Sequence, residues 1–516
     1  MSDWSAGYAA DIEYLASYYR EQTPRHLALA CNLSGFEAPA LDRGYSYCEL
    51  GCGLGFTLNL LAAADSGGQF FGIDFNPAHI ARARALAAAA GLENVAFHEA
   101  SFEELAAPGS SLLTTQFDFI VLHGVYSWVS RENRRAIVAL LRRWVKPGGL
   151  VYISYNAMPG WARDWPLQRL LLDHAELNSV RSDRQIEAAI GLAENLVQAN
   201  ALHSLHKPLL EDMRKRLDRG EVRYLVHEYL NRNWEPLYFS DVAREVGEAK
   251  LSFVGSATLI DNFDHLQLTS EQRELLAAVP RALRETVKDH CVNKRFRRDL
   301  FVRGARPLSD QQRKRRLDSF RLALAVPRRF VELKLDLPVG QGSLSPRTYN
   351  PLFDALVDGP KSVGELLGLR ALREAGSTIE SVELAGALVG TRQAAPVRDA
   401  TPTDHARARR FNEVLAEQLI HEGSNSSAAL ASATLGAGIP VVPLELLIWA
   451  QIAREPKATA EAIAAGVLAR LDAAGESLMH EGRPVGTDAD RRNTFTAEMR
   501  ELLEDRAPLW RSLALL

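Results

Sequence analysis

A glycine-rich turn follows an acidic residue near the start of the chain. Gly51, Gly53 and Gly55 stand at alternate positions after Glu49, between a short apolar run and a helix-compatible run over 57–64. Glycine lacks a Cβ, so such a turn can adopt positive φ and let a ligand lie against its backbone, while the free N–H groups of the following helix start point at that ligand. The spacing predicts a strand, a tight turn and a helix that together bind a ligand.

Two phosphate-binding interpretations of this turn do not fit its spacing. A dinucleotide fingerprint needs its third glycine where Phe56 stands, and a P-loop needs a lysine at that same position, before Thr57. The pattern Glu-x-Gly-x-Gly-x-Gly instead resembles motif I of the class I S-adenosylmethionine-dependent methyltransferases. The resemblance implies that the turn holds the amino-acid end of S-adenosyl-L-methionine, that Glu49 shapes the site, and that S-adenosyl-L-homocysteine is the product.

A second apolar run, 69–74, ends in an acid, Asp74, which stands 19 positions after Gly55. An acid about 20 residues after such a turn meets the ribose hydroxyls in nucleoside-binding α/β folds. A carboxylate suits this task because it can accept hydrogen bonds from both hydroxyls. We therefore assign Asp74, together with the adjacent Phe75, to the cofactor site. The alternative is a solvated aspartate in a turn before Pro77.

The turn after a third strand, 95–99, is expected to reach the adenine, as the methyltransferase pattern implies. That pattern often has an acid where this chain has Ser101, but a hydroxyl can also bond the exocyclic amine. The next residue, Phe102, either stacks on the base or packs under the loop. We assign both residues to the cofactor site.

The N-terminal segment 8–34 carries helical spacing, and Pro24 is placed to begin the second of two helices. We expect this pair of helices to form a lid before the sheet begins. Tyr14, Tyr18 and Tyr19 either touch cofactor or substrate or pack in the ordinary way. Of these three, Tyr18 is assigned to the cofactor.

A fourth strand, 117–122, is almost continuously apolar, which is typical of a strand buried on both faces of a parallel sheet. His123, Tyr126 and Trp128 follow at its carboxyl end. Ligands in open α/β sheets bind outside these ends, so we expect the reactive edge of the sheet here and assign His123 to the cofactor.

A capped helix and a glycine turn lead to a fifth strand. Ser130 caps a helix over 131–144, and Lys-Pro-Gly-Gly at 146–149 turns into the strand 150–154. This turn is a frequent companion of motif I in methyltransferases. The predicted acceptor side, with aromatic walls and a hydrogen-bond acceptor around an amine, consists of Tyr126, Trp128, Tyr155 and Asn156. The alternative is that these are packing residues beneath a lid.

Four further segments are similar to bacterial methyltransferases that carry a methyltransferase regulatory domain. They are 123–129 (HGVYSWV), 154–161 (SYNAMPGW), 227–230 (HEYL) and 297–304 (RRDLFVRG). That group includes bacterial protein-lysine methyltransferases of similar length, and the resemblance covers residues 1–305. It implies a protein lysine as acceptor, and a homodimer is possible.

The expected fold class is α/β, with an N-terminal Rossmann-like seven-stranded methyltransferase sheet, a mainly helical middle domain and a C-terminal region with a winged-helix-like segment. The predicted domains are a cofactor-binding domain with its lid over 1–165, a helical regulatory or dimerisation domain over 166–305, a winged-helix-like domain over 306–395 and a helical domain over 396–516. Composition predicts a linker at 394–403 and a loop at 423–427.

Composition restricts the remaining possibilities. The net charge is −4, 47% of the residues are hydrophobic, and the four cysteines include no C-x-x-C pair, which argues against a disulfide framework. We find neither a secretory leader nor an apolar run of 18 residues, so we expect a soluble cytoplasmic protein without a membrane span. His227 lacks a second histidine at zinc-protease spacing, and His203 with His206 has no further ligand, so no metal is expected.

One stretch is strongly basic. Residues 281–330 contain 16 Lys and Arg against 5 Asp and Glu. A basic belt of this kind either recruits an acidic partner or presents helix faces that pair with the acidic remainder of the chain. We favour the second interpretation and expect no nucleic-acid partner, since aromatic interleaving is sparse here.

The predicted chemistry is SN2 transfer of the sulfonium methyl to an amine, with catalysis by proximity and in-line alignment. Protein lysine is favoured because large accessory domains are unnecessary for a small-metabolite enzyme. Two alternatives stay open. One is a methyltransferase of small molecules or natural products, and the other is a regulatory protein that binds the cofactor without turnover, for which Ser101 in place of an acid is the best support.

Overall fold

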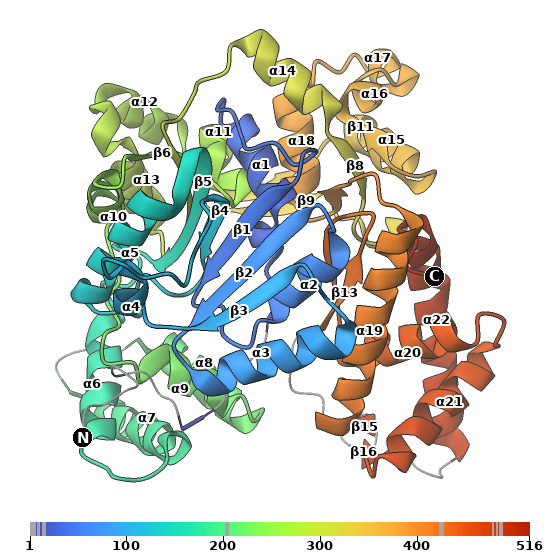
Figure 1. The fold of residues 1–516 in the computed structure, drawn as a ribbon, viewed down its shortest axis with the longest axis horizontal. Helices are drawn as coiled ribbons and strands as arrows, with labels where there is room; N and C mark the ends of the chain where they lie inside the picture. The colour runs from blue at the N-terminus through green and yellow to red at the C-terminus, as the bar shows by residue number, and fades with distance from the viewer. Residues whose placement is uncertain are drawn as a thin grey trace.

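A mixed seven-stranded sheet stands at the centre of the molecule (Figure 1). The computed structural model describes residues 7, 11–12, 17–201, 206–422, 428–476, 479–480, 483–484 and 489–516. The strand order is β3 (Val95–Glu99), β2 (Gly68–Asp74), β1 (Tyr45–Leu50), β4 (Phe117–Leu122), β5 (Val145–Asn156), β7 (Phe296–Arg303) and β6 (Leu251–Ser256). The first five strands pair in parallel, whereas β7 runs antiparallel to both neighbours. The predicted Rossmann-like seven-stranded sheet is confirmed.

The last two strands come from a part of the chain that the sequence predicts to be helical. β6 and β7 lie inside the range 166–305, and β7 pairs with β5 along seven residues, from Leu150 opposite Val302 to Asn156 opposite Phe296. The helical interpretation is therefore wrong for these two segments. Because their partners are distant in sequence, local periodicity carries little sign of the pairing.

Helices cover both faces of the sheet. One face packs against α1 (Pro24–Leu33), α2 (Phe56–Ala64) and α3 (Pro77–Ala90), and the other against α4 (Phe102–Ala106), α5 (Arg131–Trp144) and α10 (Phe239–Gly247). Alternate residues of β5 divide between them: Tyr152 joins the core on the α1 face, and Val151 and Ile153 join the core on the α5 face. This alternation decides which side chains meet at the carboxyl edge.

The local signals around the sheet are confirmed. α2 follows Gly55, which is left-handed at φ 66°, and α3 ends at Gly91, also at φ 66°. Ser130 caps α5 by accepting a hydrogen bond from the Asn133 N–H. The Lys-Pro-Gly-Gly turn forms an irregularity within β5, between the pairs Phe117–Val145 and Phe119–Leu150.

The N-terminal lid differs from its prediction. The second helix, α1, begins at Pro24 as expected, but residues 17–19 carry no helix and Arg20–Gln22 form one 3-10 turn, η1. Tertiary contacts explain the extended backbone, because Tyr18 and Tyr19 point to different partners, described below. Most of the first predicted helix, with Tyr14, lies outside the described residues, as do His203 and the loop predicted at 423–427.

The first four helices of the middle region form a group at the lower left of Figure 1. A third hydrophobic cluster packs them around buried aromatic residues such as Trp161, Tyr229 and Trp234. These helices are α6 (Trp165–Glu176), α7 (Ser182–Gln198), α8 (Lys207–Asp218) and α9 (Val222–Tyr229). Further along, η2 (Leu259–Asn262), α11 (Asp264–Gln267), α12 (Ser270–Ala278), η3 (Arg281–Leu283) and α13 (Arg284–Val292) connect β6 to β7.

The segment predicted to be winged-helix-like contains a three-stranded sheet, ordered β11-β8-β12. Its elements are α14 (Asp310–Ser319), β8 (Arg321–Leu324), η4 (Arg328–Phe330), β9 (Lys334–Leu337), β10 (Gly340–Ser343), α15 (Pro346–Val357), β11 (Lys361–Ser362), α16 (Val363–Leu367), α17 (Arg370–Glu374), α18 (Ser381–Gly390) and β12 (Ala394–Pro396). The winged-helix assignment stays a prediction. The linker predicted at 394–403 is wrong at its start, since β12 pairs with β8 there.

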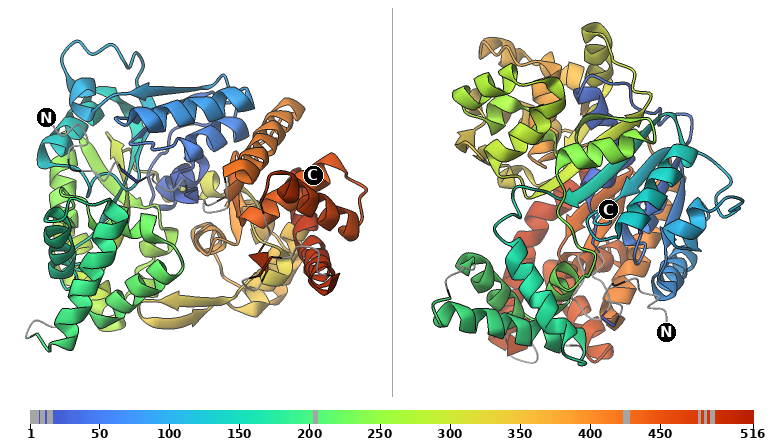
Figure 2. Two further views of the ribbon diagram at one scale, coloured as in Figure 1. Left: turned by 90° about the horizontal axis from the view of Figure 1, so that it is seen from below. Right: turned by 90° about the vertical axis from the view of Figure 1, so that its left-hand side faces the viewer.

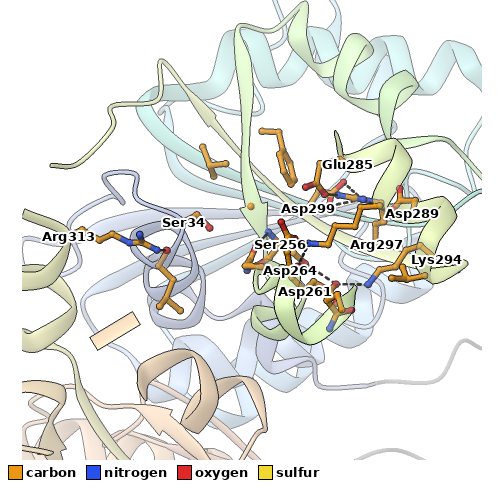
Figure 3. A pocket seen from close by; sticks show the side chains of 18 residues that line it. Ser34, Ser256, Asp261, Asp264, Glu285, Asp289, Lys294, Arg297, Asp299 and Arg313 are labelled. Carbon is orange, nitrogen blue, oxygen red and sulfur yellow. Dashed lines mark hydrogen bonds and ion pairs between the residues drawn. The ribbon is translucent and has the colours of Figure 1, made fainter. Parts of the chain in front are cut away.

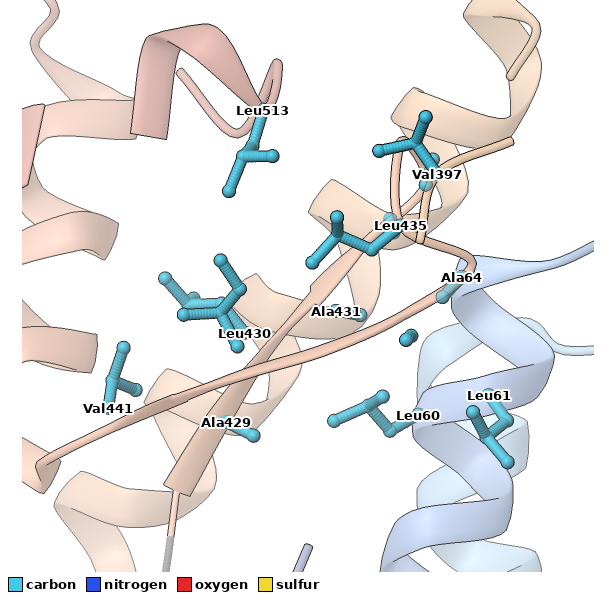
Figure 4. Packing of buried hydrophobic residues seen from close by; sticks show 14 of the residues in the cluster. Leu60, Leu61, Ala64, Val397, Ala429, Leu430, Ala431, Leu435, Val441 and Leu513 are labelled. Carbon is cyan, nitrogen blue, oxygen red and sulfur yellow. The ribbon is translucent and has the colours of Figure 1, made fainter. Parts of the chain in front are cut away.

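The C-terminal part packs directly on the cofactor domain. Figure 1 shows its first helix, α19, coloured orange, beside α2 and α3, with the red helices farther out, and Figure 2 gives two further views. Leu60, Leu61 and Ala64 of α2 share one buried core with Leu430 and Leu435 (Figure 4). The elements are α19 (Pro402–Glu422), β13 (Ala428–Ser432), β14 (Ala437–Val441), α20 (Pro443–Arg454), α21 (Ala460–Ala473), β15 (Met479–His480), β16 (Arg483–Pro484) and α22 (Ala489–Ser512). The helix that follows the glycine turn is thus supported from both sides.

Among the helices of the described residues, none is long and apolar enough to cross a lipid bilayer.

Candidate functional site

The glycine turn has the backbone that its sequence predicts. Gly51, Gly53 and Gly55 have φ values of 75°, 53° and 66°, a region that side chains with a Cβ rarely adopt. A Cβ at Gly51 would stand 2.6 Å from Val125 Cγ2, and one at Gly55 would stand 2.6 Å from Ala83 Cβ. A Cβ at Gly53 would meet nothing within 4 Å. Packing therefore requires two of the glycines, and the third leaves open space beside the turn.

Asp74 ties the glycine turn to the end of β2. Its Oδ2 accepts a hydrogen bond from the Gly53 N–H at 2.8 Å, and its Oδ1 accepts one from the Asn76 N–H at 3.0 Å. The Nδ1 of His79 lies 3.2 Å from the same Oδ1. A carboxylate has about four acceptor positions, so these contacts leave room for a ligand hydroxyl, most of all on Oδ2.

Glu49, at the end of β1, is buried and incompletely bonded. Its Oε2 has no hydrogen-bond partner among the described residues. Burial first, and the nearby charge of Asp74 second, raise the pKa of Glu49 to about 8. A buried, unsatisfied carboxyl is costly unless a ligand completes its hydrogen bonds. Two adjacent acids and an open glycine turn fit the ammonium group of the amino-acid end and the ribose hydroxyls of S-adenosylmethionine.

The raised pKa of Glu49 predicts a pH-dependent stability. The folded protein retains a proton here that the unfolded chain releases, so this contribution to the free energy of unfolding is present at low pH and is lost as the pH rises from about 5 to about 8. In Glu49→Gln the free energy of unfolding should fall less steeply over this range, by at most about 1.4 kcal/mol per pH unit. Urea unfolding at several pH values, without cofactor, measures both slopes, and equal slopes would contradict the prediction.

The predicted adenine side is formed by the start of α4. Ser101 caps this helix, since its Oγ accepts a hydrogen bond from the Glu104 N–H at 3.1 Å and Glu104 Oε2 accepts one from the Ser101 N–H at 2.7 Å. The Ser101 hydroxyl proton is not used in this capping box and stays available to a ligand. Phe102 is half-buried against the core of the α5 face, and Phe75 is half-buried after β2. Their contact with adenine stays a prediction.

His123 lies where the reactive edge is expected, among polar and aromatic groups of the α1 face. Its Nδ1 is hydrogen-bonded to the Tyr152 hydroxyl at 2.8 Å. The ring of Tyr19 has its centre 3.8 Å from that of His123, and the ring of Phe296 has its centre at 6.3 Å. The sequence marks Tyr19 only as one of three tyrosines that either contact a ligand or pack, and it does not mark Tyr152, which stands inside a strand.

Arg298, on β7, is the cation of this edge. Its charge lowers the pKa values of His123, Tyr19 and Tyr152, in each case with a smaller effect than burial has. Its Nε is buried and has no hydrogen-bond partner among the residues described. Burial together with this cation lowers the pKa of His123 to about 3, so the imidazole is neutral at physiological pH. No sequence signal beyond the RRDLFVRG similarity pointed to this residue.

The four residues predicted for the acceptor side do not gather at one place. Tyr126 and Tyr155 are fully buried in the core of the α5 face, where their hydroxyls donate to Glu245 at 2.7 Å and to Asp299 at 2.6 Å. Both tyrosines are therefore packing residues, which was the alternative interpretation of the sequence. The expectation that they form walls is corrected because the alternation along β5 turns Tyr155 away from His123.

Asn156 and Trp128 remain candidates for the acceptor side. Asn156 ends β5 and lies on the same face as Tyr152, because residues two and four positions apart line one face of a strand. It is buried, and its Nδ2 has no partner in the part of the chain that the structure describes. Trp128 packs on the cluster of the middle helices, with its ring centre 6.2 Å from that of Trp234.

Tyr18 links the cofactor domain to the C-terminal part. Its hydroxyl accepts a hydrogen bond from the Gly438 N–H of β14 at 2.9 Å. Next to it, Glu21 pairs with Arg392 at 2.9 Å, and Arg20 donates to the carbonyl of Val389. These contacts hold the extended segment that presents Tyr19 to His123. The assignment of Tyr18 to the cofactor stays a prediction.

A charged cavity of about 300 Å³ lies at the β6 edge of the sheet (Figure 3). Arg297 donates to Asp289 at 2.6 Å and to Glu285 at 2.8 Å, while Lys288 and Lys294 bond Asp264 and Asp261, each at 2.5 Å. All these cations belong to the basic stretch 281–330. Their pairing supports the interpretation in which the basic stretch is matched by acids of the same chain.

Within the described ranges, no three or more His, Cys, Asp or Glu side chains form a group that could hold a metal ion.

Two family models of methyltransferases match this chain. Residues 41–207 match the methyltransferase domain model, and residues 221–303 match the model of the predicted methyltransferase regulatory domain. The protein sll1526 of Synechocystis is 36% identical over an alignment of 516 positions that covers 99% of this chain and 99% of that protein. RP789 of Rickettsia prowazekii is 27% identical over 56% of this chain and 52% of its own length.

The solved structures include a match that spans nearly the whole chain. PKMT2 from Rickettsia typhi in complex with AdoHcy superposes with a TM-score of 0.69 at 19% identity, and the match covers 95% of this chain and 98% of that one. The regulatory-domain match contains α9, β6 and β7, so this region completes the central sheet. The chain belongs, with sll1526, to the family of S-adenosylmethionine-dependent methyltransferases that carry a methyltransferase regulatory domain.

Proposed function

We propose that this enzyme methylates an amine, namely the side chain of lysine residues in proteins. The observation that carries the proposal is the electrostatic character of the edge around His123. Burial and Arg298 hold His123 neutral, and burial raises the pKa values of Tyr19 and Tyr152, so these groups stay uncharged as well. An amine that binds at this edge is likewise buried and lies near the charge of Arg298.

These influences favour the nucleophilic form of an amine. Desolvation and a nearby cation both disfavour the ammonium ion, so the pKa of the bound amine falls and its lone pair becomes available. The cofactor carries the methyl group on a sulfonium. When the methyl group is transferred, the sulfur leaves as a thioether without the help of an acid. The protein residues then have to bind and orient the acceptor: the rings of Tyr19 and Phe296 form apolar walls that exclude water, and the carboxamide of Asn156 offers hydrogen bonds.

The cofactor is held by the residues on the other side of this edge. Glu49, Gly53 and Asp74 offer an unsatisfied carboxyl oxygen, an open stretch of backbone and a carboxylate with free acceptor positions. We assign the amino-acid end to the first two and the ribose to the third.

The accessory regions support a protein acceptor. More than half of the chain lies outside the methyltransferase domain match at 41–207, and PKMT2 from Rickettsia typhi has the same fold over 95% of this chain. If the acceptor were a small molecule, these regions would have no evident role in recognising it.

Methyl labelling separates the two acceptor classes. The purified full-length protein is incubated with methyl-labelled S-adenosylmethionine and a bacterial lysate, and the protein and low-mass fractions are counted separately. We expect label in protein bands and none with Asp74→Ala. Label confined to the low-mass fraction would favour a small-molecule acceptor, and cofactor binding without any transfer would favour a regulatory protein.

A further inference from the structure

Two buried hydroxyls converge on one nitrogen of His123. The hydroxyl of Tyr152 lies 2.8 Å from Nδ1, and the hydroxyl of Ser154 lies 3.3 Å from the same atom. Tyr152 and Ser154 are both 0% exposed and stand two residues apart on one face of β5. Because water does not reach these hydroxyls, each of their protons needs an acceptor from the chain itself.

The available acceptors decide how this cluster is oriented. The oxygen of Ser154 already accepts a hydrogen bond from the Gly124 N–H at 2.9 Å. Among the described residues, the Ser154 proton then has two acceptors to choose from, Nδ1 of His123 and the oxygen of Tyr152. If Nδ1 carries no proton, it accepts the hydrogen bond of Tyr152, and Ser154 donates to either neighbour. Every proton of the cluster then has an acceptor.

A proton on Nδ1 would disturb this arrangement. The Nδ1–H would donate to one of the two oxygens, and one of the two hydroxyl protons would be left without an acceptor. A buried polar group without its hydrogen bond costs about 1–3 kcal/mol. The penalty applies to the Nδ1–H tautomer and to the imidazolium ion alike. His123 is therefore neutral and carries its proton on Nε2, which agrees with its pKa, lowered to about 3 by burial and by Arg298.

The Nε2 of His123 is directed to no partner of the chain. His123 is half-buried, and its Nε2 makes no hydrogen bond within the part of the chain that the structure describes. This nitrogen is also not among the buried atoms that lack a partner. The Nε2–H is thus a donor that a ligand can reach.

Glu49 lies beside His123 on the neighbouring strand. Glu49 of β1 pairs with Val121 of β4, and His123 follows Val121 by two positions on the same face. The loops beyond these strands also touch, since a Cβ at Gly51 would stand 2.6 Å from Val125 Cγ2. The unsatisfied carboxyl of Glu49 and the imidazole of His123 therefore lie next to each other at the carboxyl edge of the sheet.

From this arrangement we propose that the Nε2–H of His123 binds the carboxylate of the cofactor's amino-acid end, and that Tyr152 and Ser154 are the positioning residues that hold His123 as a donor. The inference rests on the proposed function, which assigns the same end of the cofactor to Glu49. The ammonium and the carboxylate of an α-amino acid are attached to one carbon atom, so their binding groups have to lie side by side. A hydrogen bond from an N–H to a carboxylate is charge-assisted, whereas a bare Nε2 would repel the carboxylate.

The simpler alternative is that the two hydroxyls only pack beside the imidazole. Their removal would then lower stability and weaken the binding of every cofactor analogue to the same extent. If His123 binds the carboxylate, the loss depends on whether the ligand carries one.

Calorimetry with two analogues and the full-length protein separates these cases. S-adenosyl-homocysteine has the ammonium and the carboxylate, and decarboxylated S-adenosyl-homocysteine has the ammonium alone. In His123→Leu the first ligand should bind about 10- to 100-fold more weakly, the loss expected for a hydrogen bond to a charged group. The second ligand should bind as it does to the wild type. His123→Gln should keep part of the affinity, because its amide N–H takes the place of the Nε2–H.

Tyr152→Phe tests the positioning role. Without the tyrosine proton, only Ser154 donates to Nδ1, across the longer contact of 3.3 Å, so the two tautomers should mix. S-adenosyl-homocysteine should bind about 3- to 10-fold more weakly, the effect of one ordinary hydrogen bond, and the decarboxylated analogue should bind unchanged. NMR of protein labelled on its histidine nitrogens reports the tautomer directly. The signal of His123 is the one of 13 that His123→Leu lacks.

Tyr45→Phe is the matched control, since the buried hydroxyl of Tyr45 donates to Asp65 at 3.2 Å at the opposite end of the sheet. Both affinities should stay unchanged in this variant. A wild-type His123 with its proton on Nδ1, or an equal loss for both analogues in His123→Leu, would overturn the inference. If both analogues bind the wild type equally and lysine is methylated, the inference is wrong while the proposed function stands. If His123 governs carboxylate binding but no amine is methylated, the proposed function fails and the inference stands.

Discussion

Replacing Asp74 by alanine should remove most of the cofactor affinity. The carboxylate holds the Gly53 N–H at 2.8 Å and the Asn76 N–H at 3.0 Å, so it fixes the turn as well as offering acceptors to the ribose. Each hydrogen bond to a charged group contributes about 1.5–3 kcal/mol, and more than one is lost, so we expect binding at least roughly 100-fold weaker. Calorimetry with S-adenosyl-homocysteine measures the change.

Asp118→Ala is the matched control for this variant. Asp118 stands at the opposite, amino end of β4 and bonds Ser46 and Lys146, at 2.9 Å and 2.7 Å. Its loss should lower stability and leave the cofactor affinity of the folded protein unchanged. A cofactor affinity that is the same in Asp74→Ala as in the wild type would remove the basis for the whole cofactor site.

Arg297→Met should be the most destabilising single change that we consider. Arg297 is 4% exposed, and its guanidinium donates to Asp299 at 2.9 Å, to Asp289 at 2.6 Å and to Glu285 at 2.8 Å. Removing it leaves acids buried without a counter-charge, a change that costs about 3–5 kcal/mol of unfolding free energy. Urea unfolding at pH 8 measures the loss.

The sign of its pH dependence follows from the acids that remain. The pKa of Asp289 is raised to about 7, chiefly by burial, even with Arg297 present, and it should rise further without it. Protonation at lower pH relieves the buried charge, so the deficit of the variant should shrink as the pH falls. Arg370→Met, which breaks the exposed pair with Glu374, is the control and should cost less than about 1 kcal/mol. A similar cost for both variants would contradict our account of the charged cavity.

Much of the cofactor half could be predicted because its signals are local. The glycine turn, the acid that ends β2, and the capped helix α5 each depend on residues adjacent in sequence. β7 could not be found in this way, since Arg297 and Asp299 interrupt its apolar pattern, and their burial depends on their pairing with each other and with distant residues such as Tyr155. Its place in the sheet depends on β5, more than 100 residues away.

The acceptor half was harder to predict, because the face of a strand and the direction of a loop determine which side chains reach it. Tyr155 is one residue from Asn156, yet it points into the opposite core. Tyr19 reaches His123 because contacts such as that of Tyr18 with Gly438, about 420 residues away, hold the segment extended. Such choices depend on tertiary contacts that sequence periodicity does not record.

The chemical identity of the product tests the account most directly. Proteins labelled by the full-length enzyme and methyl-labelled S-adenosylmethionine are hydrolysed in acid to amino acids, which preserves N-methyl groups and releases esters as methanol. Our account predicts that the label is recovered as N-methylated lysine. Label released as methanol, or recovered in a residue without an amine, would contradict it.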